Sequence, residues 1–262
     1  MPLRRLRLLP THAIERDTVT VLLPDRQPLQ VQRVRDPRAR RIKLSVDERG
    51  ARLTLPLRAS LVSGERFLHQ HRTWLATQLA HYGGDADLPT LVRGETASLP
   101  LRGADLPLHW HQARFTLIWL DQDGVHIQLP ARATDATLRR ALREFYEGQA
   151  RADIGAWMPR YLPGLPRAPA RVRLKVMSSQ WGSLSPDGSL ALDLSLVLGQ
   201  PRAFEYVLVH ELCHLIHANH SPAFWHEVEA RFPAWREQRG YFNAHGRRLK
   251  AGLRALLSPA GD

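Results

Sequence analysis

Residues 206–225 read YVLVHELCHLIHANHSPAFW and contain an H-E-x-x-H pattern inside an apolar stretch. A shuffled chain of this composition would contain that pattern about 0.03 times, so the match is informative. Apolar residues recur at three- and four-residue spacing, which predicts a helix with one buried flank. On such a helix His210 and His214 leave the same face one turn apart and can bind one tetrahedral ion. Glu211, beside them, is placed to take a proton from water that the ion activates.

A third ligand must come from the residues that follow. His217 continues along the same helical face, but three ligands in line on a straight helix span too much rise for a tetrahedron. His220 can join only if the helix ends before it. Asn219 tolerates the left-handed conformation and is expected to supply that turn.

The next residues predict a second helix. Ser221 and Pro222 are typical of an N-cap followed by proline at the first helical position. We therefore expect His210, His214 and His220 to hold one Zn²⁺ ion, with water as the fourth ligand. An acidic third ligand from the new helix, Glu227 or Glu229, is the alternative.

The only cysteine, Cys213, lies between the two motif histidines. Its position is off the metal-binding face, so we expect a small buried residue and not a ligand. A single cysteine allows no intramolecular disulfide, which favours a reducing, cytoplasmic location. The chain has no run of eighteen apolar residues, and Met1–Pro10 lacks the apolar core of a secretory signal, so no membrane association is expected.

The combination of the H-E-L-C-H segment with Asn219-His220-Ser221 and Phe224-Trp225 resembles the YgjP-like (DUF45) metal-dependent hydrolases, which are related to SprT-like and M48-type zinc metallopeptidases. Trp181-Gly182-Ser183 and the strand-like apolar segment after it resemble the R-W-G-S-C-S segment and the asparagine-containing strand of that family. The chain differs there at three positions, with Gln180 for arginine, Leu184 for cysteine and Asp193 for asparagine. The resemblance implies a zincin-like metallopeptidase region.

The formal net charge of +12 is compatible with an anionic partner. However, basic residues are not interleaved with aromatic ones as in a base-stacking platform, so nucleic-acid binding is the less favoured interpretation. A peptide or a small molecule is the expected substrate. The sequence does not predict the oligomeric state.

The amino-terminal half alternates between apolar and polar residues. Residues 17–57 predict an antiparallel meander of strands. A helix is expected from Ser63 to a stop at Gly83-Gly84, with the Trp74 side chain in the hydrophobic core. Residues 85–130 return to strands, with a hairpin turn at Asp121–Gly124 and surface histidines at 109 and 111.

The carboxyl-terminal half is expected to be rich in helices. A long helix capped by Thr134 or Asp135 ends near Pro159 and supports the metal helix. Strands at 172–176 and 190–196 are expected to form a hairpin whose edge is offered to an extended substrate. A closing helix follows near 249–257. These patterns predict an α+β protein, with an antiparallel β-rich region at 1–130 and a zincin-like catalytic region at 131–262.

Three functions fit these features. The favoured one is a zinc metallopeptidase with Glu211 as general base. The second is a zinc hydrolase that acts on a nucleotide or another phosphorylated substrate, with arginines binding the anion. The third is a nucleic-acid-associated module in which zinc is structural and Glu211 is dispensable.

Overall fold

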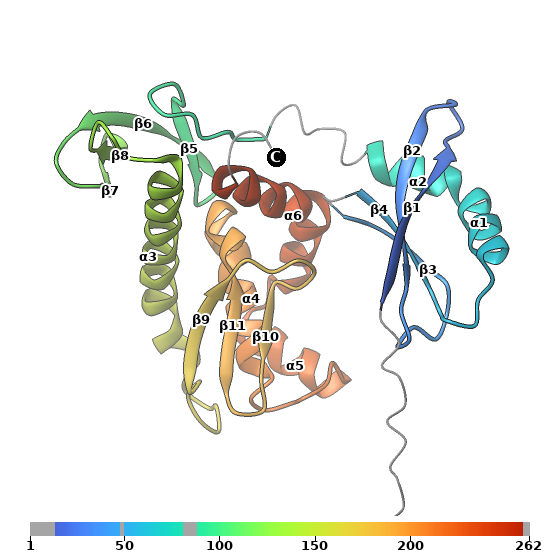
Figure 1. Cartoon of the computed structure of the whole chain (residues 1–262). Helices are drawn as coiled ribbons and strands as arrows, with labels where there is room; N and C mark the ends of the chain where they lie inside the picture. Colours follow the sequence, from blue (N-terminus) through green and yellow to red (C-terminus); the bar gives the residue numbers. More distant parts are fainter. Residues whose placement is uncertain (1–13, 48–49, 81–87, 259–262) are drawn as a thin grey trace, which may run out of the picture. The chain divides into compact units, whose positions relative to one another are not determined.

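The computed structural model describes residues 14–47, 50–80 and 88–258 (Figure 1). These residues form helices and largely antiparallel sheets, which confirms the predicted α+β class. The chain divides into two compact units, Met1–Asp87 and Leu88–Asp262. The division at residue 130 follows a change in sequence character and stays a prediction. Among the described helices, none combines the length and the apolar character needed to cross a bilayer.

The first unit contains a four-stranded sheet in the order β1-β2-β4-β3. Its strands are β1 (Glu15–Leu22), β2 (Pro28–Arg35), β3 (Lys43–Asp47) and β4 (Gly50–Leu55). The expected meander is wrong in one respect, because β2 and β4 pair in parallel and β3 lies at the edge. The reason is burial: Ala51, Leu53 and Leu55 on β4 are almost fully buried, and the centre of the sheet is where such a strand is covered.

Two helices cover this sheet, α1 (Leu61–Gln70) and α2 (Arg72–Ala80). The helix begins earlier than expected, because the Ser60 hydroxyl accepts the N–H of Ser63 and acts as the N-cap. A break at His71 changes the helical phase. Leu75 is therefore the fully buried residue of α2, whereas Trp74 is 41% exposed and its prediction as core is wrong. The expected stop at Gly83-Gly84 lies outside the described residues.

The second unit opens with a sheet in the order β5-β6-β8-β7. Its strands are β5 (Ser98–Leu101), β6 (Ala104–Gln112), β7 (Leu117–Asp121) and β8 (Gly124–Leu129). The hairpin turn at Asp121–Gly124 is confirmed. The buried residues of these strands share one core with α3 (Asp135–Tyr161), which Thr134 caps as predicted. One hydrogen bond joins them as well, from the Tyr146 hydroxyl to the Pro100 carbonyl at 3.0 Å.

A three-stranded sheet precedes the motif helix, in the order β10-β11-β9. Its strands are β9 (Arg171–Lys175), β10 (Gly182–Leu184) and β11 (Ser189–Asp193). The expected hairpin between residues 172–176 and 190–196 is wrong, because β9 and β11 are parallel and the hairpin joins β10 to β11. The buried carboxylate of Asp193, at the end of β11, holds the chain that leaves β9, since it accepts the N–H groups of Met177 and Ser195. The short strand β10 is therefore left at the edge of the sheet.

The remaining elements surround that edge. The 3-10 helix η2 (Leu194–Leu198) leads into α4 (Pro201–Cys213), which contacts α3, β10, α5 (Pro222–Arg231) and α6 (Trp235–Leu257). The closing helix expected at 249–257 is thus the last part of a longer helix. Ten of the thirteen residues of α4 are buried, so packing on several sides holds this helix in place.

Candidate active site

The motif lies at the carboxyl-terminal end of α4. His210 is in the last turn, and His214 is the C-cap residue. After the helix the backbone forms a tighter, 3-10 type of turn. The N–H of Leu215 donates to the carbonyl of Leu212, and the N–H of Ile216 donates to the carbonyl of Cys213, both at 3.0 Å. The helix therefore ends before His220, as the third-ligand hypothesis requires.

The turn itself differs from the expected one. Among the described non-glycine residues, Arg26 and Arg102 have positive φ and Asn219 does not. The Asn219 side chain instead accepts the N–H of Ser221 at 3.3 Å, a local bond typical of asparagine in turns. Ser221 then caps α5, with Pro222 in the first helical turn, as predicted.

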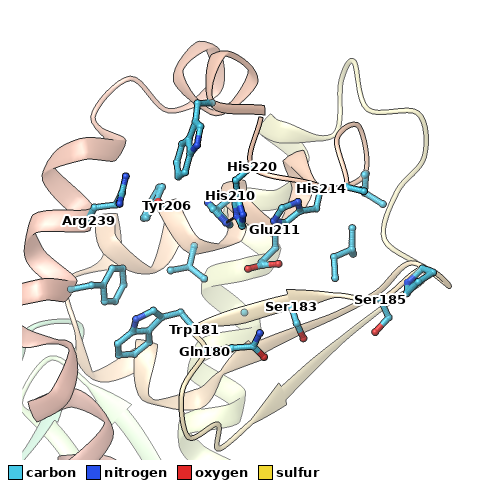
Figure 2. A pocket seen from close by; sticks show the side chains of 18 of the residues that line it. Gln180, Trp181, Ser183, Ser185, Tyr206, His210, Glu211, His214, His220 and Arg239 are labelled. Atoms are coloured by element: carbon cyan, nitrogen blue, oxygen red, sulfur yellow. Dashed lines mark hydrogen bonds between the residues drawn. The ribbon is translucent and has the colours of Figure 1, made fainter. Parts of the chain in front are cut away.

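Three imidazoles meet beside the end of α4 (Figure 2). His210, His214 and His220 each offer a ring nitrogen, and these atoms lie within 4.8 Å of one another. The Nε2 atoms of His210 and His220 are 3.0 Å apart. Two nitrogen ligands of one tetrahedral zinc ion would be about 3.3 Å apart at ordinary bond lengths.

The donor chemistry of these rings fits a metal ion. Two Nε2 atoms that face each other need a proton or a cation between their lone pairs. His214 Nδ1 lies 2.9 Å from the carbonyl of His217, and donation there leaves Nε2 of His214 as a lone pair. Burial, together with the neighbouring His214 and His220, lowers the pKa of His210 to about 3, so this ring is held in the neutral form that a metal requires.

The acidic alternatives for the third ligand lie in ion pairs. Glu227 pairs with Arg231 one turn further along α5, and Glu229 pairs with Arg236 of α6 at 2.5 Å. Within the described ranges, the His/Cys/Asp/Glu group that converges like a metal site is the three histidines. This geometry favours His220 over either glutamate.

Glu211 lies next to the three histidines and is only 6% exposed. Burial raises the pKa of its carboxyl to about 7, although a hydrogen bond from the backbone N–H of Leu184 opposes this. The strand β10 passes very close to it, since a Cβ on Gly182 would lie 2.6 Å from Glu211 Cγ. Glycine at position 182 therefore lets the edge strand and the carboxylate come into contact.

A pocket of about 870 Å³ opens over these groups. Its walls come from the 180–186 segment, from α4, from the turn after it, and from α5 and α6. Sequence reasoning missed several lining residues of these helices, namely Tyr206, Arg239, Phe242 and Asn243. Tyr206 could have been found, because it lies one turn before His210. The α6 residues carry no local motif and reach the site only through tertiary packing.

The three positions that differ from the family pattern have separate places. Gln180 and Leu184 line the pocket. Asp193 is buried below it and pairs with Lys250, whose Nζ lies 2.8 Å from the carboxylate and 2.9 Å from the carbonyls of Met177 and Gln180. Lys250 also lies 4.2 Å from the centre of the Trp181 ring. The pair thus anchors the loop that carries β10.

Cys213 is a buried free thiol, as expected, and burial raises its pKa to about 11. A protonated thiol is a poor metal ligand and a poor nucleophile. The histidines at 109 and 111 lie on β6, outside the group that converges like a metal site.

Comparison with known proteins adds one match. A family model described as YgjP-like, metallopeptidase domain, matches residues 40–245. No curated protein matches the chain. The matched range contains β10, the motif helix, the three histidines and the first half of α6.

Proposed function

The chain belongs to the YgjP-like metallopeptidase family, and from this premise we propose that it is a zinc-dependent peptidase with Glu211 as its general base. The observation that carries the proposal is the position of one buried carboxylate beside three converging imidazoles, in a pocket lined by the edge strand β10. Three nitrogen ligands with one open position are typical of catalytic zinc, whereas structural zinc has four protein ligands.

The histidines and Glu211 have separate roles in this proposal. His210, His214 and His220 would hold the ion, and zinc in such a site lowers the pKa of water toward 7 and polarises a carbonyl. Glu211 accepts the proton of the attacking water and passes it to the leaving amine. Its raised pKa suits both steps, because the group can take up and release a proton near neutral pH. The Leu184 N–H orients the carboxylate toward the pocket.

The substrate would lie along β10. This strand pairs with β11 on one side, and its other side faces α4 and the pocket. An extended peptide can add to such an edge through its backbone, which gives affinity with little dependence on sequence. The edge supports a peptide substrate over a nucleotide, although Arg167 and Arg239 also line the pocket. A cytoplasmic location stays a prediction.

The proposal is tested by metal and turnover measured together. The protein is freed of metal with a chelator, and hydrolysis of an internally quenched random peptide library is followed before and after zinc is returned. Activity should vanish and return with one zinc per chain. His220→Ala should lose zinc, whereas Glu227→Ala should keep it. If Glu227→Ala loses the metal and His220→Ala keeps wild-type occupancy, the ligand assignment is wrong.

A further inference from the structure

Arg239 lies in the wall of the pocket, on α6, about one turn after the start of that helix. Figure 2 shows Arg239 and Ser185 at opposite ends of the site, with the three histidines between them. Trp181 is at the Arg239 end, and its ring packs 4.5 Å from that of Phe242, the residue three positions after Arg239. Arg239 therefore marks the end of the pocket where β10 begins.

Two indole rings hold the guanidinium. Arg239 lies 5.2 Å from the ring centre of Trp225 and 5.5 Å from that of Trp235, and these two rings stack at 4.5 Å. Trp225 in turn stacks on His220 at 5.7 Å. Only one ring therefore separates the guanidinium from the proposed third ligand. Stacking on aromatic faces limits the movement of arginine and leaves its N–H groups available.

The charge of Arg239 has no carboxylate partner among the described residues. Of the described residues that line the pocket, Glu211 is the one carboxylate, and it accepts a hydrogen bond from the backbone N–H of Leu184. Arg236, one turn earlier on α6, provides a comparison. It also lies over Trp235, at 4.4 Å, but it forms an ion pair with Glu229 and does not line the pocket.

The direction of β10 determines which part of a peptide would reach Arg239. Antiparallel pairing is slightly more stable than parallel pairing. A peptide antiparallel to β10 runs from the Ser185 end toward the Trp181 end. The residues that follow the scissile bond therefore approach Arg239.

We propose that Arg239 binds a substrate carboxylate on the C-terminal side of the scissile bond. This carboxylate is either the terminal α-carboxylate or an Asp or Glu side chain. The planar guanidinium can hold it through two parallel hydrogen bonds. The inference rests on the proposed function, because it assumes that a peptide lies along β10.

Binding of uncleaved probes tests the inference. Zinc-loaded Glu211→Gln protein is titrated with dansyl-Ala-Phe-Ala carrying a free carboxylate and with the same peptide amidated. We expect the free acid to bind at least about tenfold more tightly, as for a charge-assisted bidentate contact. Adding Arg239→Gln should reduce this ratio to about one, and adding Arg236→Gln should leave it unchanged. Melting temperatures of all variants identify any loss of fold.

A second pair of probes separates the two sources of the carboxylate. Dansyl-Ala-Phe-Asp-amide and dansyl-Ala-Phe-Asn-amide differ only in the side-chain charge. If the Arg239-dependent preference follows the amidated Asp probe, a side chain is the ligand; if it appears only with the free terminus, the α-carboxylate is. A preference that is absent, or that persists in Arg239→Gln, overturns the inference. Turnover by Glu211→Gln would instead overturn the proposed function, whatever the binding ratios.

Discussion

Gly182 allows the edge strand to approach Glu211, because any side chain at that position meets the carboxylate. We predict that Gly182→Ala lowers kcat by about a hundredfold, since displacement of a catalytic group by about 1 Å can have that effect. Zinc content should be unchanged. Gly148→Ala, in a helix where the added Cβ meets nothing within 4 Å, is the matched control. Wild-type turnover by Gly182→Ala would show that the contact does not position the base.

Asp193 and Lys250 form a buried pair below the pocket, and the side chains are only 1% and 9% exposed. Burial lowers the pKa of Lys250, and the Asp193 carboxylate opposes that shift. Asp193→Asn keeps the shape of the side chain but removes the counter-ion. We predict that it lowers the free energy of unfolding by about 3 kcal/mol, as for other broken buried pairs. Denaturant titration measures this.

The double variant Asp193→Asn with Lys250→Met provides the control for that prediction. It removes both charges, so it should recover part of the lost stability. If Asp193→Asn alone is as stable as the wild type, the lysine does not depend on the carboxylate. The two backbone carbonyls that it contacts would then be sufficient partners.

At the scale of elements, α5 begins where the third histidine is needed. The Ser221 hydroxyl accepts the N–H of Phe224 and fixes the residue after His220. Ser221→Ala should cost about 1 kcal/mol of stability, as for other N-caps, and should weaken zinc binding severalfold. Ser60→Ala removes a similar cap from α1 in the first unit. It should cost a similar amount and leave zinc affinity unchanged; equal zinc affinities in both variants would contradict the prediction.

The elements that sequence reasoning placed correctly are those with local signals. The apolar period predicts α4, the serine and proline predict the start of α5, and the Asp121–Gly124 turn predicts a hairpin. Parallel pairing of β2 with β4 and of β9 with β11 was missed, because side chains alternate equally in parallel and antiparallel strands. Trp74 was misplaced because nothing in the sequence marks the break at His71.

At the scale of the whole molecule, the site depends on contacts that are distant in sequence. The H-E-x-x-H motif alone predicted two histidines and Glu211, and capping signals supported His220. Arg239 and Lys250 could not be predicted, since α6 is brought to the site by packing against α4 and η2, which no local pattern in the sequence marks. The family match ends at residue 245, so Lys250 lies just beyond it.

The central claim is that Glu211 takes the proton from water beside a zinc ion held by the three histidines. Glu211→Gln keeps the shape of the side chain and removes the base. The most direct measurement is therefore kcat of this variant on the peptide library, together with its zinc content. We predict one zinc per chain and a kcat lowered by about 10² to 10⁴, the usual contribution of a general base. Full zinc occupancy with wild-type turnover would contradict the account.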